Sequence, residues 1–212
     1  MSVNNPLHMR GIEFTEFTAP INVQHNGSMV DQISGIFFAF GFSKLKKHAS
    51  KEIIYYRQNN IHFLLNYEKD GFSSDFANKH GASICSMGWR VDDAEFAFDE
   101  AIRRGALPAD ETLKDLSYPA IYGIGGSLIY FIDQYDNDNS LWDNDFINLE
   151  KQTIVKSKGF TDIDHLTNNV FKGTMDTWAT FYKDVFGFEE VRYFDIKGQK
   201  TALLSYALRS PD

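Results

Sequence analysis

The stretch Ile163-Asp-His-Leu-Thr-Asn-Asn-Val170, with Phe186-Gly-Phe188 downstream of it, shows the pattern that decides the fold. The first stretch alternates as a β-strand does, and helical spacing of apolar residues at about 174–185 ends at the Phe-Gly-Phe triplet. The same order occurs near the N-terminus, where Ile12–Thr18 precedes a predicted helix that ends at Phe40-Gly-Phe42. The offset is 151 residues for Ile12 and 146 for Phe40, which indicates an internal repeat.

Each repeat continues into further predicted strands, and a middle segment follows the same plan. The middle helix ends at Gly105 and begins after Asp92 or Asp93, either of which can cap it. Tight turns are expected at Asn59-Asn60 and at Gly123-Ile-Gly-Gly126, where a following strand excludes a phosphate-binding loop. The further predicted elements are the strands Ile53–Gln58, Ile61–Tyr67, Ile84–Val91, Ala120–Tyr122, Ser127–Ile132, Glu190–Ile196 and Lys200–Ala207 and the helix Ala94–Arg104.

This order predicts an α+β fold of paired βαβββ modules, in which two modules form a curved sheet around a cleft. Residues 1–152 are expected to form a complete domain of two modules, and residues 153–212 to begin a second domain. The charged stretches Asp133–Asp145 and Glu150–Lys158 are predicted to link the two domains. The third module is incomplete, so we expect its helix and its sheet each to leave one face uncovered.

Composition narrows the classes of function. The 212 residues are 43% apolar and 24% charged, with a net charge of −8, which disfavours contact with nucleic acid or an anionic membrane. The longest near-apolar run, Ile33–Phe42, is too short to span a bilayer, and the N-terminus lacks the features of a signal peptide. Cys85 is the single cysteine, expected to be a buried inert thiol, and a cytoplasmic setting fits.

Three stretches resemble 4-hydroxyphenylpyruvate dioxygenase, a family of the vicinal oxygen chelate superfamily with a glyoxalase-like fold. They are Pro119–Asp133, Ile163–Val170 and Phe181–Gly198. The resemblance implies a cytoplasmic iron(II) enzyme that converts 4-hydroxyphenylpyruvate, a 2-oxo acid, and O2 to homogentisate and CO2 in tyrosine catabolism. It also implies a homo-oligomer, either a dimer or a tetramer.

The resemblance assigns site residues one by one. The family holds one iron(II) ion with two histidines and one carboxylate, and the first histidine matches His165. The other two ligands are expected beyond Asp212. A serine that faces the substrate matches Ser205, and strand alternation adds Thr167 as a pocket-lining residue, with Asp164 on the opposite face of the strand.

The internal repeat gives separate support for His165. The equivalent position in the first module is Phe14, an expected core residue, so the first domain is predicted to have lost its ligand position and to act as a scaffold. The other histidines show no spacing typical of metal ligands and are interpreted as surface or turn residues. They are His8, His25, His48, His62 and His80.

Two alternatives stay open at this point. Hydroxymandelate synthase resembles the dioxygenase throughout this region and differs in where the oxygen atom is placed. A binding module that kept the fold and lost the metal ligands is the second alternative. In either case the 212-residue chain alone is not expected to retain iron tightly or to consume oxygen.

Overall fold

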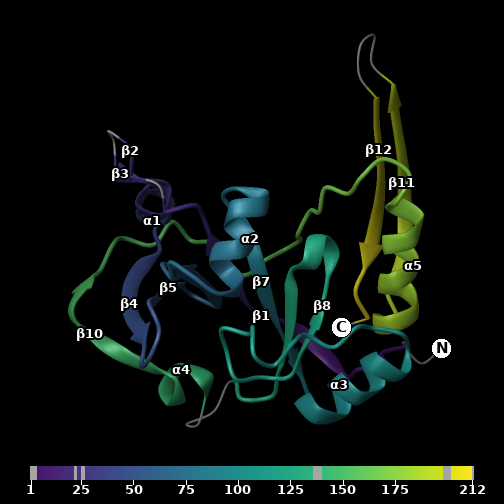
Figure 1. Ribbon diagram of the computed structural model, residues 1–212. Helices are drawn as coiled ribbons and strands as arrows, with labels where there is room; N and C mark the ends of the chain where they lie inside the picture. The colour runs from purple at the N-terminus through teal and green to yellow at the C-terminus, as the bar shows by residue number, and fades with distance from the viewer. Residues whose placement is uncertain (1–3, 22, 25–26, 136–139, 198–201, 212) are drawn as a thin grey trace.

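The computed structural model describes residues 4–21, 23–24, 27–135, 140–197 and 202–211. One eight-stranded sheet occupies the centre of the molecule, with strand order β10-β4-β5-β6-β1-β7-β9-β8 (Figure 1). The strands of this sheet are β1 (Met9–Thr18), β4 (Ser43–His48), β5 (Ile53–Gln58), β6 (Ile61–Asn66), β7 (Ser83–Val91), β8 (Ala120–Tyr122), β9 (Leu128–Ile132) and β10 (Phe146–Thr153). The short pair β2 (Val23–Gln24) and β3 (Gly27–Ser28) lies outside it.

The sheet confirms the expected pair of modules. In the first module β1 runs parallel to β6, and in the second module β7 runs parallel to β9. The two first strands, β1 and β7, pair antiparallel and join the modules. In the second module, the strand expected directly after the helix is reduced to one isolated β-bridge between Pro108 and Ile121.

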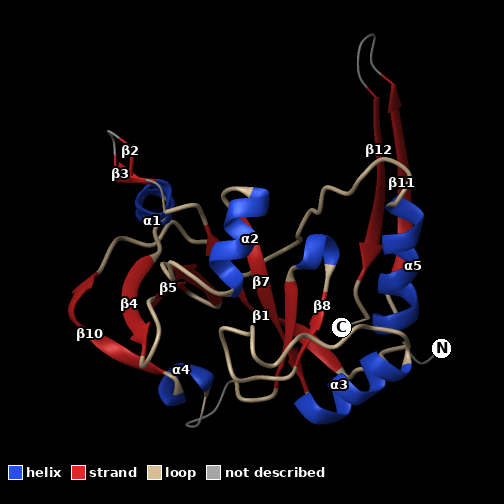
Figure 2. Ribbon diagram, in the orientation of Figure 1, coloured by secondary structure: helices blue, strands red, loops and turns tan. Residues whose placement is uncertain are grey.

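Helices and a short 3-10 turn connect these strands (Figure 2). Their bounds are α1 (Met29–Ala39), α2 (Phe72–His80), α3 (Ala94–Arg103), η1 (Ile124–Gly126) and α4 (Leu141–Asn144). Asp93 caps α3 as predicted, since its side chain accepts a hydrogen bond from the Phe96 N–H. Asn59 adopts φ 50° in the predicted turn between β5 and β6. No helix in the described ranges combines the length and apolar character needed to cross a membrane.

Strand alternation divides the core between the two faces of the sheet. Along β9, Ile129 and Phe131 face α3, whereas Leu128, Tyr130 and Ile132 face the opposite side and meet Phe14. Along β5, the alternate residues Ile54 and Tyr56 instead pack beneath α1. The face that holds Phe14 therefore runs through both modules, and each module covers its other face with its own helix.

The stretch from residue 133 to residue 158 is more ordered than the predicted linker. Leu141–Asn144 forms α4, and Phe146–Thr153 forms β10, which pairs antiparallel with β4. The prediction of a linker is therefore wrong for these residues, while residues 136–139 lie outside the described ranges. The charges misled the sequence interpretation because β10 is an edge strand with mostly exposed side chains, and edge strands commonly carry charge.

The third module contains α5 (Met175–Phe186) and the antiparallel strands β11 (Glu189–Lys197) and β12 (Ala202–Arg209). The predicted strand Ile163–Val170 is not a strand in the structure. In the first module β1 pairs with β6 and β7, whereas β11 and β12 pair only with each other. A segment without a neighbouring strand has no ladder to join, so alternation alone did not make it a strand.

Helix α5 packs against the first domain, beside α3 (Figure 1). Tyr182, Val185 and Phe186 are buried in the cluster that contains Trp89 of β7, and the Trp89 and Phe186 ring centroids are 4.4 Å apart. The expectation of an uncovered helix face is therefore wrong for this side of α5. The expectation fits the hairpin better, because β11 and β12 extend away from the sheet and Val191 and Leu204 are exposed.

Candidate functional site

His165 lies on an exposed segment that connects β10 to α5. Its side chain is 73% exposed and that of Asp164 is 95% exposed. His165 Nδ1 lies 2.7 Å from Asp164 Oδ2. The prediction that alternation separates these two side chains is therefore wrong, because the segment is not a strand. A carboxylate on one ring nitrogen is the usual partner of a metal-binding histidine, and it leaves Nε2 to face a metal.

Both sides of the Asp164–His165 pair are held by apolar contacts. Ile163 packs against the cluster beneath α1, and Leu166 packs against the cluster around Trp89. The backbone thus crosses from one module of the first domain to the other, while the imidazole points into solvent. This arrangement presents His165 without burying it.

The three predicted site residues lie on two parts of the third module: His165 and Thr167 on the segment Ile163–Val170, and Ser205 on β12. Thr167 is exposed, and Ser205 is half-buried on β12 opposite Phe194. The neighbouring Tyr206 donates a hydrogen bond to Asp176 of α5 at 2.8 Å, so Ser205 faces away from α5 by strand alternation. Within the described ranges, no hydrogen bond or ring contact joins His165 to Thr167 or Ser205.

The donor set of this chain does not by itself fit a ferrous ion. Among the described residues, no group of three or more His, Cys, Asp or Glu side chains is placed to hold a metal. An iron site of the two-histidine, one-carboxylate type needs three protein donors on one face. Of three such donors, the sequence analysis assigned one, His165, to this chain.

Phe14 occupies the interior of the first domain, as the comparison of the modules predicted. It is fully buried, and its ring lies 6.1 Å from those of Tyr130 and Trp142. Its neighbour across the ladder is Gly88, where a Cβ atom would overlap the ring. Aromatic side chains therefore fill the position that corresponds to His165.

A buried carboxylate on the same face escaped the sequence analysis. Glu16 is fully buried and accepts hydrogen bonds from Ser86 Oγ at 2.5 Å and Asn66 Nδ2 at 2.8 Å. Asn66 also donates to Asp115, whose other carboxylate oxygen lies 3.0 Å from Lys51 Nζ. Burial and the charge of Asp115 raise the pKa of Glu16 to about 7. The sequence did hold a signal of this burial, because Glu16 lies two residues from Phe14 and therefore on the same face of the strand.

His62 is a second polar group in this interior, and its interpretation as a surface or turn residue is wrong. It is 6% exposed, its Nδ1 lies 2.7 Å from Tyr55 Oη, and its ring stacks on Trp142 at 4.9 Å. Burial lowers the pKa of His62 to about 3, so the ring is neutral at pH 7. Glu13 accepts a hydrogen bond from Nε1 of the same Trp142 at 2.6 Å and another from Arg90.

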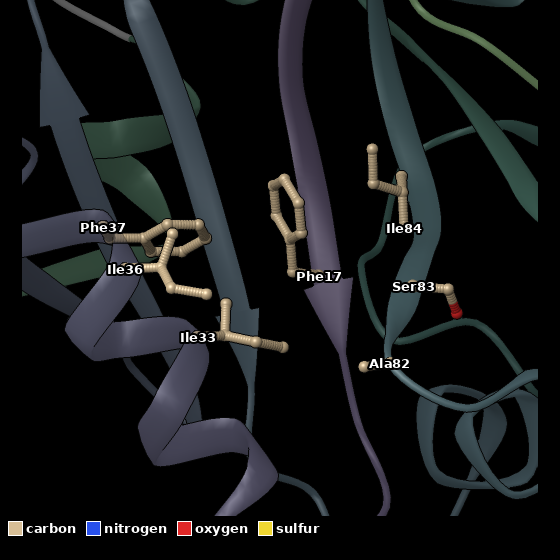
Figure 3. A pocket seen from close by; sticks show the side chains of 7 residues that line it. All are labelled: Phe17, Ile33, Ile36, Phe37, Ala82, Ser83 and Ile84. Atoms are coloured by element: carbon tan, nitrogen blue, oxygen red, sulfur yellow. The ribbon is translucent and has the colours of Figure 1, made fainter. Parts of the chain in front are cut away.

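Cys85 and an apolar hollow beside α1 were also considered as functional features. Cys85 is buried as predicted, and burial raises the pKa of its thiol. An apolar hollow of about 280 Å³ lies between α1 and the start of β7 (Figure 3). Ser83 is its one polar lining residue; the others are Phe17, Ile33, Ile36, Phe37, Ala82 and Ile84. Apart from the Ser83 hydroxyl, this lining contains no polar side chain and no ionisable group.

Comparison with known proteins identifies the family. The family described as hydroxyphenylpyruvate dioxygenase, N-terminal, matches residues 3–147, which is more than half of the chain. The chain belongs to the 4-hydroxyphenylpyruvate dioxygenase family. The fold agrees, since the chain superposes with a TM-score of 0.78 at 29% identity on a fusion protein of a xylose isomerase-like TIM barrel and 4-hydroxyphenylpyruvate dioxygenase. That superposition covers 98% of this chain and 32% of the fusion protein.

Several curated relatives of this family are similar over the whole chain. Protein MelA of Shewanella colwelliana is 60% identical, over 100% of this chain and 59% of its own length. Hemolysin VllY of Vibrio vulnificus is 43% identical, over 98% and 58% respectively. The 4-hydroxyphenylpyruvate dioxygenase of Pseudomonas aeruginosa is 41% identical, over 98% and 57%. The chain thus spans less than two thirds of the length of each of these relatives.

Proposed function

We propose that this chain is the N-terminal part of an iron(II)-dependent dioxygenase that converts 4-hydroxyphenylpyruvate and O2 to homogentisate and CO2. Membership of the family, together with an exposed His165 whose Nδ1 is paired with Asp164, supports this proposal. If iron(II) is bound, His165 would be one of the residues that hold it, and the metal would supply the oxidative chemistry that a 2-oxo acid and O2 require.

Within this scheme the residues of the chain have separate tasks. His165 supplies one metal ligand through Nε2, because Asp164 engages Nδ1. Ser205 contacts the substrate, and Thr167 lines the pocket. We place the two further iron ligands in the sequence that corresponds to the remaining length of the relatives. The working protein is proposed to be a cytoplasmic homo-oligomer, either a dimer or a tetramer.

The decisive test uses His165→Ala in the full-length protein. Because the side chain is 73% exposed, its loss should leave the unfolding transition of the first domain in place while iron content falls to background. The exposed His8, changed to Ala, is the control and should keep its iron. Full iron content in His165→Ala would overturn the assignment, whereas a wild-type protein that holds no iron at all would favour a non-catalytic module of the same fold.

A second measurement separates the dioxygenase from hydroxymandelate synthase. The chain also shares the fold of a variant of 4-hydroxymandelate synthase from Streptomyces coelicolor, with a TM-score of 0.69 at 18% identity. Chromatography of the products formed from 4-hydroxyphenylpyruvate should give homogentisate rather than hydroxymandelate. The 212-residue chain alone should give no oxygen-electrode signal with this substrate, because it supplies one of three donors.

A further inference from the structure

The segment that leads to His165 is fastened to the first domain by one buried amide. Gln58, at the end of β5, is 3% exposed. Its Oε1 accepts hydrogen bonds from Ser157 Oγ at 2.8 Å, Lys158 N at 2.6 Å and Gly159 N at 3.1 Å. Its Nε2 donates to the carbonyl oxygen of Phe40 at 3.0 Å. All polar atoms of the Gln58 side chain are thus used to join the segment to the end of α1.

Gly41 allows the segment to approach this closely. It has φ +88°, and a Cβ atom there would lie 2.8 Å from Lys158 N and 2.9 Å from the Lys156 carbonyl oxygen. These atoms belong to the backbone of the segment and cannot rotate away. A residue larger than glycine would push residues 156–158 off the domain.

The turn between β5 and β6 continues the attachment toward His165. Asn59 Nδ2 donates to the Phe160 carbonyl oxygen at 2.5 Å, and Asn60 N donates to the Thr161 carbonyl oxygen at 3.2 Å. Ile163 then packs on the cluster beneath α1. The attachment therefore reaches to within two residues of His165.

We propose that Gln58 is a positioning residue for His165, acting through residues 157–162; this rests on the proposed role of His165 as an iron ligand. The physical reason is that, among the residues that the structure describes, Ile163–Val170 joins no strand ladder, whereas the backbone just before it is held by hydrogen bonds to Gln58 and to the turn after it. Hydrogen bonds to two consecutive backbone N–H groups fix the direction in which the chain enters the Asp164–His165 pair. The first domain thereby sets the position of a ligand that it does not itself contain.

Hydrogen exchange tests the attachment without any metal. Gln58→Leu removes the acceptor, and Gly41→Ala displaces the segment. In either variant of the 212-residue chain, the amides of Lys158 and Gly159 should exchange at least about tenfold faster. Ser34→Ala removes another buried hydrogen bond, 2.8 Å to Tyr56 Oη, and is the control for Gln58→Leu. Gly105→Ala has the same kind of backbone strain at φ +101° with nothing near its Cβ, and is the control for Gly41→Ala.

Iron titration of the full-length protein, followed anaerobically by calorimetry, tests the consequence for His165. Gln58→Leu and Gly41→Ala should each bind Fe(II) about tenfold or more weakly than wild type, because loss of the groups that orient a metal ligand commonly lowers metal affinity by that factor. The two control variants should bind Fe(II) as wild type does. Faster exchange with unchanged iron affinity would refute positioning by Gln58, and unchanged exchange would refute the attachment itself. If His165→Ala binds iron as wild type does, the proposed ligand role fails instead, so the two failures are distinguishable.

Discussion

Replacement of the buried Glu16 by Gln should make the stability of this protein less sensitive to pH. Glutamine has the shape of a protonated glutamate and keeps an acceptor and a donor where Asn66 and Ser86 contact the carboxylate. It cannot ionise, and it stands beside Asp115, which contributes to the raised pKa of Glu16. The variant therefore removes one buried negative charge and little else.

The pKa of Glu16 sets the size and the direction of the effect. Folding raises this pKa from 4.5 to about 7. Because this pKa is raised, the contribution of Glu16 to the free energy of unfolding is complete below pH 4.5 and is lost as the pH rises through 7. For a rise of about 2.5 pKa units, at about 1.4 kcal/mol per unit, the loss reaches about 3–4 kcal/mol. We therefore expect Glu16→Gln to match wild type near pH 4.5 and to be more stable by up to about 3–4 kcal/mol at pH 8.5.

Urea unfolding followed by tryptophan fluorescence, repeated from pH 4.5 to 8.5, measures this difference. The wild-type profile alone is not diagnostic, because burial lowers the pKa of His62 from 6.5 to about 3. That shift adds stability as the pH rises toward 6.5 and opposes the effect of Glu16. The difference between wild type and Glu16→Gln cancels the contribution of His62. Parallel profiles would refute the reasoning, and the exposed Glu95→Gln should follow wild type throughout.

Two further substitutions test the packing. Phe186→Ala should lower the free energy of unfolding by about 3–5 kcal/mol, because the ring is buried against Trp89, whereas the 88% exposed Phe171→Ala should change it by no more than about 0.5 kcal/mol; equal effects in urea unfolding would contradict the docking of α5. Gly88→Ala should cost about 1–3 kcal/mol, because its Cβ would overlap the Phe14 ring, whereas Gly35→Ala inside α1, with nothing within 4 Å, should stabilise by about 0.5–1 kcal/mol. A thermal melt in which both glycine variants shift in the same direction would contradict this account of Gly88.

Much of the fold could be predicted from the sequence because the relevant signals are local. The turn at Asn59-Asn60 and the cap at Asp93 each depend on residues within one turn of the chain. The strand predicted at Ser127–Ile132 also depends on neighbours in sequence, and β9 (Leu128–Ile132) matches it within one residue. The paired modules followed because the repeat placed equivalent strands, β1 and β7, at the centre of the sheet.

The parts that could not be predicted depend on partners distant in the sequence. Ile163–Val170 alternates like β1, but strand formation also needs a neighbouring strand, which the sequence pattern does not reveal. The edge strand β10 was hidden by its charges. The contact of Gln58 with residues 157–159 joins positions about 100 apart, and a glutamine at the end of a strand carries no signal of such a role.

The interior of the first domain shows why His165 is the candidate ligand and the equivalent position in the first module, Phe14, is not. A histidine in place of Phe14 would enter a face packed by Tyr130 and Trp142, with no exit to solvent. The nearby carboxylates of Glu13 and Glu16 are already bound by Arg90, Trp142, Ser86 and Asn66. A metal there would have to displace these partners and leave them unsatisfied in a buried site, at a cost of about 1–3 kcal/mol each. The described interior around Phe14 is therefore filled by packing and internal hydrogen bonds, and the proposed link from this interior to His165 is the segment that Gln58 holds.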